Sequence, residues 1–117
     1  MEEGGAKLMR SEERRRARRV SCRCEARGYG VGEALSAPRL SDISETGAFV
    51  ETGSELPLRS AVLLRFDAGG RRLRVEAEVV HRDPDRGMGL RFLDLGPRQR
   101  DLIARVVTES SRSREAS

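Results

Sequence analysis

Apolar and polar residues alternate over several short segments of this chain, and the alternation predicts β-strands. Over residues 72–80, the apolar side chains of Leu73, Val75, Ala77 and Val79 alternate with charged ones. A period of two places one set of side chains on a buried face and the other set in water. Further strands are predicted at residues 20–25, 38–43, 48–52, 61–66 and 88–95.

Glycine and proline separate these segments and predict the turns between them. The pair at residues 69–70 offers the positive φ that a tight hairpin needs. Residues 83–87 (DPDRG) have the composition of another turn. Three glycines within residues 28–32 predict a further turn region around Tyr29. Consecutive strands are therefore expected to pair antiparallel.

The last apolar pattern of the chain has the spacing of a helix. Leu102, Ile103, Val106 and Val107 form one stripe after Pro97, a residue that is favoured in the first helical turn. The stripe would dock this helix on the strands. We therefore predict a mostly β fold, a six-stranded antiparallel β-barrel with a C-terminal α-helix.

The two ends of the chain lack such periodicity. We predict a disordered lead-in at residues 1–12, a folded domain at residues 13–108 and a disordered tail at residues 109–117. A chain of 117 residues, 37% of them apolar, fits one domain with one modest core.

Charge and aromatic content narrow the classes of function. The net charge is only +4, so the molecule as a whole does not attract nucleic acid strongly. Aromatic residues make up 3% of the chain, few for a protein that stacks single-stranded bases. No apolar stretch could span a bilayer, and the first residues lack the apolar core of a secretory signal. We expect a cytoplasmic protein without membrane insertion.

The two cysteines are separated by one residue. In a strand, Cys22 and Cys24 would point the same way, at or beyond the reach of a disulfide. A metal site would need further ligands, and the only histidine, His81, lies far along the chain. We interpret both cysteines as small core residues and expect no metal.

Two polar clusters stand out against the predicted strands. Residues 13–19 (ERRRARR) place five arginines directly before the first strand, and residues 42–47 (DISETG) separate the second strand from the third. Arginine can fork onto a phosphate or onto guanine O6 and N7. An aspartate carboxylate matches the N1–H and N2–H₂ donors on the opposite edge of guanine. The two clusters could therefore bind both edges of one guanine, although Asp and Ser also stabilise turns.

These residues resemble the PilZ domain, the bacterial receptor module for cyclic di-GMP. The family pattern is RxxxR before the first strand and (D/N)xSxxG after the second, and residues 15–19 and 42–47 match it. Residues 87–95 (GMGLRFLDL) also resemble the closing strand of the family. Either motif alone is weak evidence in so arginine-rich a chain. Both in this order, with matching strands and a final helix, form a specific signal over residues 13–108.

The resemblance implies a role for each residue of the two motifs. Two arginines would bind guanine and phosphate, the aspartate would accept from guanine, the serine would contact phosphate or sugar, and the glycine would hold the turn. An additional arginine often precedes the first motif. The implied ligand-binding residues are Arg14, Arg15, Arg19, Asp42, Ser44 and Gly47.

Two assignments within this set are ambiguous. Arg14 and Arg18 have the same spacing as Arg15 and Arg19, and we prefer the second pair because Arg19 directly precedes the strand. His81 lies where some family members place an aromatic ring against the ligand. Alternation puts it in phase with the inward residues, so a bulge or a position at the barrel mouth would be needed. The simpler interpretation of His81, a hydrogen-bonded side chain at a strand end, is preferred.

The resemblance implies a receptor and adaptor without catalytic activity and without any cofactor besides the ligand. A single histidine and the lack of a glycine-rich phosphate loop also argue against an enzyme. Cyclic di-GMP would reorder the N-terminal arm and so regulate a partner protein in motility, biofilm or exopolysaccharide control. The protein could be a monomer or a homodimer. The alternatives are a PilZ-like adaptor that binds no nucleotide and a nucleic-acid binder that uses the basic arm.

Overall fold

The computed structural model describes residues 19–68 and 70–116, and the side chains of most of them. The strands are β1 (Val20–Gly30), β2 (Glu33–Ala34), β3 (Arg39–Ile43), β4 (Gly47–Glu51), β5 (Ala61–Ala68), β6 (Arg71–Asp83) and β7 (Gly87–Leu93), followed by the helix α2 (Pro97–Ala116).

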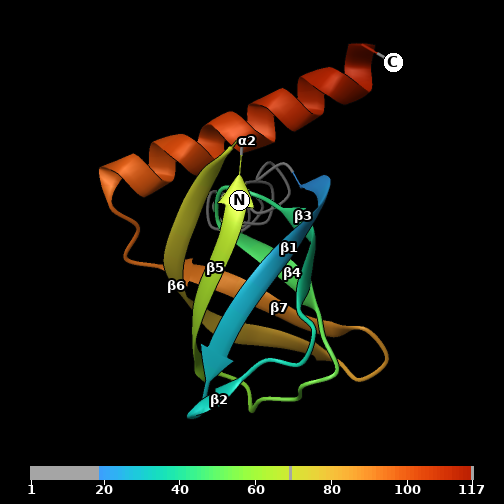
Figure 1. Ribbon diagram of the computed structural model, residues 1–117, viewed down its shortest axis with the longest axis vertical. Helices are drawn as coiled ribbons and strands as arrows, with labels where there is room; N and C mark the ends of the chain where they lie inside the picture. Colours follow the sequence, from blue (N-terminus) through green and yellow to red (C-terminus); the bar gives the residue numbers. More distant parts are fainter. Residues whose placement is uncertain (1–18, 69, 117) are drawn as a thin grey trace, which may run out of the picture.

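The strands form one antiparallel sheet that closes on itself. Their order is β2-β1-β3-β4-β7-β6-β5, and an additional pairing between β1 and β5 joins the two ends of the sheet. The short β2 only extends the β1 hairpin, so six strands make the barrel wall (Figure 1). This confirms the predicted six-stranded barrel with a C-terminal helix.

The apolar core fills the interior of the barrel. Along β6, the alternating residues Leu73, Val75, Ala77 and Val79 are all buried, as the sequence predicted. Equivalent alternation on the other strands supplies the rest of the core. Burial of this apolar surface is the main stabilising term of the fold.

The helix α2 covers one end of the barrel and contacts β1 and β5 (Figure 1). Ile103 and Val107 from the predicted stripe are buried in the core, and Leu102 and Val106 pack against it. Within the described residues, no helix is both long and apolar enough to cross a membrane.

The strand β1 is longer than the sequence suggested. The three glycines within residues 28–32 were expected to form a turn, but Gly28 and Gly30 lie inside β1 and only Gly32, with φ 77°, belongs to the turn. A Cβ atom at Gly28 would lie 2.6 Å from the side chain of Leu35, and one at Gly30 would lie 2.6 Å from that of Leu56. The prediction was wrong here because these glycines serve close packing rather than chain reversal.

The helix also continues further than predicted. The sequence analysis placed a disordered tail at residues 109–117, but α2 extends to Ala116. No glycine or proline follows Pro97 in the sequence to end the helix. The polar composition that suggested a tail therefore belongs to the end of α2.

Replacement of Ile103 by alanine should destabilise the protein by about 2–5 kcal/mol. Ile103 is a residue of α2 whose side chain is fully buried against the barrel, so a shorter side chain leaves a cavity between the helix and the barrel. Urea denaturation measures the change. Thr108→Ala, at an exposed position of the same helix, is the control and should change stability little. Equal stability of the two variants would contradict the docking of α2.

Candidate functional site

One residue from each motif lies beside the start of β1. Arg19 directly precedes β1, and Asp42 lies on β3, where it pairs with Ser21 of β1. The Arg19 Nη1 atom lies 3.8 Å from Asp42 Oδ1. The antiparallel pairing of β1 with β3 thus brings together two predicted residues that are far apart in the sequence.

Asp42 also lines a hollow of about 390 Å³ on the outer surface of the barrel. Two arginines and two carboxylates surround this hollow, and Arg86 Nη2 lies 3.6 Å from Glu51 Oε2. Its lining residues are Ser21, Arg39, Leu40, Ser41, Asp42, Glu51 and Arg86. The guanidinium groups can form bidentate hydrogen bonds with an anion, and the carboxylates can accept hydrogen bonds, so the hollow suits a polar ligand that carries negative charge.

One oxygen of Asp42 lacks a donor. The side chain is 27% exposed, but its Oδ1 atom is buried and forms no hydrogen bond with any described residue. The Arg19 guanidinium is too distant to donate a hydrogen bond of normal length. A buried acceptor without a donor is unfavourable by about 1–3 kcal/mol. A ligand N–H group at this position would remove that penalty.

Ser44 stabilises the turn that follows β3. It is 2% exposed, and its Oγ atom accepts hydrogen bonds from the backbone N–H groups of Thr46 and Gly47, each at 3.2 Å. The hydroxyl can donate in turn to the Gly47 carbonyl at 3.3 Å. The Ser44 hydroxyl is thus used within the turn, whereas its contact with phosphate or sugar stays a prediction.

Gly47 permits a close approach of two strands. It is the first residue of β4 and pairs with Arg91 of β7. A Cβ atom at this position would lie 2.1 Å from the carbonyl oxygen of Leu90. The backbone of Gly47 takes part in the turn, since its carbonyl oxygen accepts from the Ser44 N–H group at 2.8 Å. Its φ is not positive, so the lack of a side chain is required by the packing against β7.

A row of residues extends from Asp42 across the outer face of the barrel. Asp42 pairs with Phe49 of β4, Phe49 pairs with Gly89 of β7, and Gly89 pairs with His81 of β6. The Arg86 guanidinium lies over the Phe49 ring, 4.7 Å from its centroid. Phe49 is buried but lies outside the core cluster, and the sequence analysis did not identify either Phe49 or Arg86.

His81 is exposed on this outer face. A bulge between Val79 and His81 shifts the register of β6, which is the irregularity that the sequence analysis required for an outward histidine. Gly89 lies between His81 and Phe49 in the row, and a Cβ atom there would lie 3.2 Å from the His81 Cβ atom and 4.0 Å from the Phe49 ring. Contact of His81 with a ligand stays a prediction. Arg14, Arg15 and Arg18 lie outside the described residues.

The two cysteines are free and belong to the first half of β1. Both are half-buried and pack against the core, and Cys22 Sγ lies 3.7 Å from the Leu40 carbonyl oxygen. Burial, together with neighbouring Cys24 and the charge of Asp42, raises the pKa of Cys22 to about 12. Cys22 is therefore a neutral thiol at physiological pH. Among the residues that the structure describes, no group of three metal-ligating side chains occurs.

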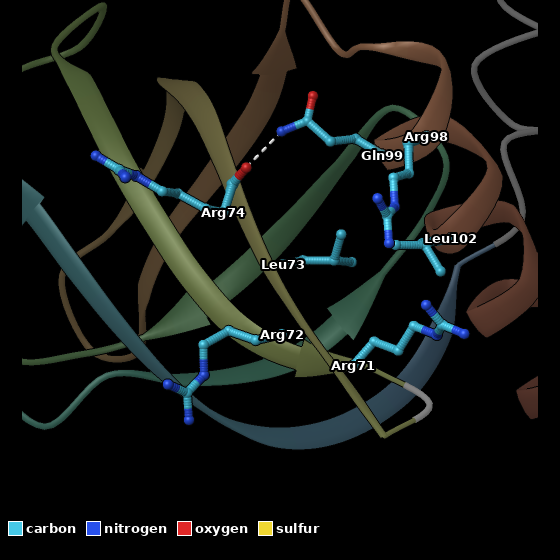
Figure 2. Close-up of a pocket in the computed structure, with 7 residues that line it drawn as sticks. All are labelled: Arg71, Arg72, Leu73, Arg74, Arg98, Gln99 and Leu102. Atoms are coloured by element: carbon cyan, nitrogen blue, oxygen red, sulfur yellow. Dashed lines mark hydrogen bonds between the residues drawn. The ribbon is translucent and has the colours of Figure 1, made fainter.

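A second hollow, of about 400 Å³, lies between β6 and the start of α2 (Figure 2). Gln99 from α2 donates to the backbone carbonyl of Arg74, and its Oε1 atom accepts from the N–H group of Gly96. These bonds fix the start of the helix on the barrel. None of the ligand-binding residues predicted from the sequence lines this hollow, which is formed by Arg71, Arg72, Leu73, Arg74, Arg98, Gln99 and Leu102.

The comparison with protein families agrees with this arrangement. The family model described as PilZ domain matches residues 13–109, nearly the whole described barrel and helix. The chain belongs to the PilZ domain family. PilZ domains are generally receptors for cyclic di-GMP rather than enzymes. A search of curated proteins gave no match.

Three solved structures, two of them PilZ domains, share the fold of this PilZ chain. The PilZ domain of YcgR from Escherichia coli, solved with c-di-GMP, has a TM-score of 0.68 and 17% identity, and the match covers 88% of this chain and 95% of that one. The PilZ domain of CeSA from a cellulose-synthesizing bacterium has a TM-score of 0.64 and 18% identity, with 79% and 96% covered. A Legionella protein, Lpg0364, has a TM-score of 0.53 and 16% identity, with 84% and 98% covered.

Replacement of Gly47 by alanine should destabilise the PilZ fold by about 1–3 kcal/mol or more, because the new methyl group meets the backbone of β7. Thermal unfolding measures the effect. Gly53→Ala is a matched control, since a Cβ atom there would meet only the Ser36 hydroxyl at 4.0 Å. A Gly47→Ala variant as stable as the native protein would contradict the close approach of β4 and β7.

The stability of the protein should fall between about pH 9 and pH 12 in a manner that depends on Cys22. The unfolded thiol loses its proton near its ordinary value of 9.0, whereas the pKa of the folded thiol is raised to about 12. Between these two pKa values the folded state binds more protons than the unfolded state, so rising pH favours unfolding. Below about pH 9 the Cys22 thiol makes its full contribution to the free energy of unfolding. Urea denaturation over this range should give a steeper decline for the native protein than for Cys22→Ala. Equal declines would contradict the assignment.

Proposed function

We propose that this PilZ protein binds cyclic di-GMP at the hollow beside Asp42 and regulates a partner protein through that event. The supporting observation is the meeting of Arg19 and Asp42, with one Asp42 oxygen buried and without a hydrogen bond among the described residues. A guanine N1–H or N2–H₂ group is a donor of the kind that this oxygen lacks. The ligand would therefore relieve an unfavourable feature of the free protein.

The remaining charges around the hollow suit the rest of such a ligand. Arg39 and Arg86 lie at its edge and would attract the two phosphodiester groups. Arg19 is 63% exposed, so its guanidinium is free to turn from Asp42 toward a guanine or a phosphate. Arg14 and Arg15 would add further contacts from the N-terminal arm. His81 would offer its ring to a base, and Ser44 would act mainly through the shape of the turn.

The proposed mechanism couples binding to the order of the N-terminal arm. Ordering about six residues costs roughly 1–2 kcal/mol each. Charge-assisted hydrogen bonds contribute about 1.5–3 kcal/mol apiece. Several of these with base stacking leave a net of about 8 kcal/mol, which corresponds to micromolar affinity. The reordered arm and the adjacent barrel face would then contact the partner protein, in the cytoplasm, in motility, biofilm or exopolysaccharide control.

Replacement of Arg19 or Asp42 by alanine should weaken the binding of cyclic di-GMP more than about tenfold, a loss of about 1.4 kcal/mol or more. Each variant removes a charged partner of the ligand and leaves the barrel core unchanged. Isothermal titration calorimetry measures the affinity, with GTP and linear pGpG as comparison ligands. Arg105→Ala and Asp101→Ala, at exposed positions of α2, are matched controls and should bind as the native protein does.

Two results would contradict this proposal in different ways. Unchanged affinity in both Arg19→Ala and Asp42→Ala would mean that the nucleotide binds elsewhere. A native protein that binds none of the three nucleotides would instead be an adaptor that works through protein contacts alone.

A further inference from the structure

Three arginines form a row across the outer face of the barrel, away from the proposed nucleotide site. Arg27 of β1 pairs directly with Arg65 of β5, and Arg65 pairs directly with Arg74 of β6. All three side chains are exposed. Figure 2 shows Arg74 directed away from Leu73 and from α2, toward this outer face. We call Arg27, Arg65 and Arg74 the arginine row.

The arginine row is electrostatically unfavourable for the fold. Residues directly opposite each other on antiparallel strands have Cβ atoms about 4.5–5.5 Å apart, and like charges in such pairs are destabilising. No ion pair joins any of the three to a carboxylate among the side chains that the structure describes. Some other surface arginines form ion pairs, as Arg91 does with Glu78 at 2.6 Å, and some, such as Arg59, form none with a described side chain. Only the arginine row, however, places three of them directly opposite one another on neighbouring described strands. Three opposed cations without partners indicate a surface that is completed by an anionic molecule.

Apolar side chains lie next to the arginine row on the same face. Two residues further along the strands, Tyr29 of β1 pairs with Leu63 of β5, and Leu63 pairs with Glu76 of β6. Tyr29 is 48% exposed, and Leu63 is half-buried. Tyrosine and arginine are enriched at the centre of protein–protein interfaces, where each combines a large contact area with a polar group.

Carboxylates limit the extent of the positive surface. On one side of the arginine row, Asp67 is paired with Arg72 at 3.4 Å, and on the other side Glu76 follows Arg74 by two residues. A long polyanion such as nucleic acid, lying along the strands, would meet these carboxylates after one or two phosphates. A compact acidic group with an apolar neighbour would match the arginines and Tyr29 together. The arrangement of charge therefore favours a protein over a nucleic acid.

We propose that the arginine row, with Tyr29 and Leu63, is a docking surface for a protein segment that presents two or three carboxylates beside an apolar side chain. This inference deepens the proposed function, because it names the surface for the partner that an adaptor requires, and it rests on that function for the existence of a partner. The surface is separate from the hollow at Asp42, so the two kinds of binding can be measured independently.

Synthetic peptides provide the test. The probes are a fluorescein-labelled peptide with equal numbers of glutamate and phenylalanine, the same peptide with glutamine in place of glutamate, and a labelled oligothymidylate. Fluorescence anisotropy with the full chain at low salt should show binding of the acidic peptide and much weaker binding of the other two. The triple variant Arg27→Gln, Arg65→Gln, Arg74→Gln should lose about tenfold in affinity for the acidic peptide.

A matched variant controls for the loss of positive charge. Arg98→Gln, Arg100→Gln, Arg105→Gln removes three exposed arginines from α2 and should bind the acidic peptide as the native protein does. An equal loss in this variant would mean attraction by net charge alone and would overturn the proposal. Tighter binding of the oligothymidylate than of the acidic peptide would also overturn it, in favour of nucleic acid.

Two further measurements separate this surface from the fold and from the nucleotide site. The triple variant of the arginine row should melt at the temperature of the native protein or a few degrees higher, since opposed charges are removed. A lower melting temperature would assign these arginines to stability and contradict the proposal. The same variant should bind cyclic di-GMP with unchanged affinity, so that loss of peptide binding there refutes only the docking surface.

Discussion

The arrangement of this protein depends on the pairing of one strand, β1, with two others. The first half of β1 pairs with β3, and the second half pairs with β5, which closes the sheet into a barrel. The first pairing brings the residue before β1 next to the carboxylate of Asp42. The second pairing aligns Arg27 with Arg65 on the opposite part of the wall. The hollow beside Asp42 and the arginine row therefore both depend on the pairing of β1 with β3 and β5.

Within the motif at residues 42–47, two residues serve the fold, and one is proposed to contact the ligand. Ser44 uses its hydroxyl inside the turn, and Gly47 keeps β4 close to β7. Asp42 alone leaves an acceptor atom without a hydrogen-bond partner among the described residues. In the proposed site, the structural residues fix the backbone, and the fixed backbone orients the Asp42 side chain toward the hollow that it lines.

The sequence predicted the barrel and the proximity of Arg19 and Asp42, because the first depends on local patterns and the second on the pairing of neighbouring strands. Strict alternation along β6 defines its buried face, and the two motifs flank a strand pair that antiparallel pairing must bring together. Three features could not be predicted from the sequence, each for a physical reason. The sequence around Gly28 predicts a turn, because the packing of Leu35 against this glycine is visible only in the folded structure. An apolar residue in a strand, such as Phe49, is expected in the core, but Phe49 lies on the outer face beneath Arg86. The arginine row depends on the register between neighbouring strands, which the sequence of one strand alone does not determine.

The double pairing of β1 has a consequence for the order of events during folding. The hairpins β3–β4, β5–β6 and β6–β7 join segments that are neighbours in the sequence, so their closure involves short loops. The contacts of β1 with β5 and of β4 with β7 join segments that are far apart in the sequence, so their closure costs more chain entropy. These two pairings complete the barrel and are thus expected to form late and slowly.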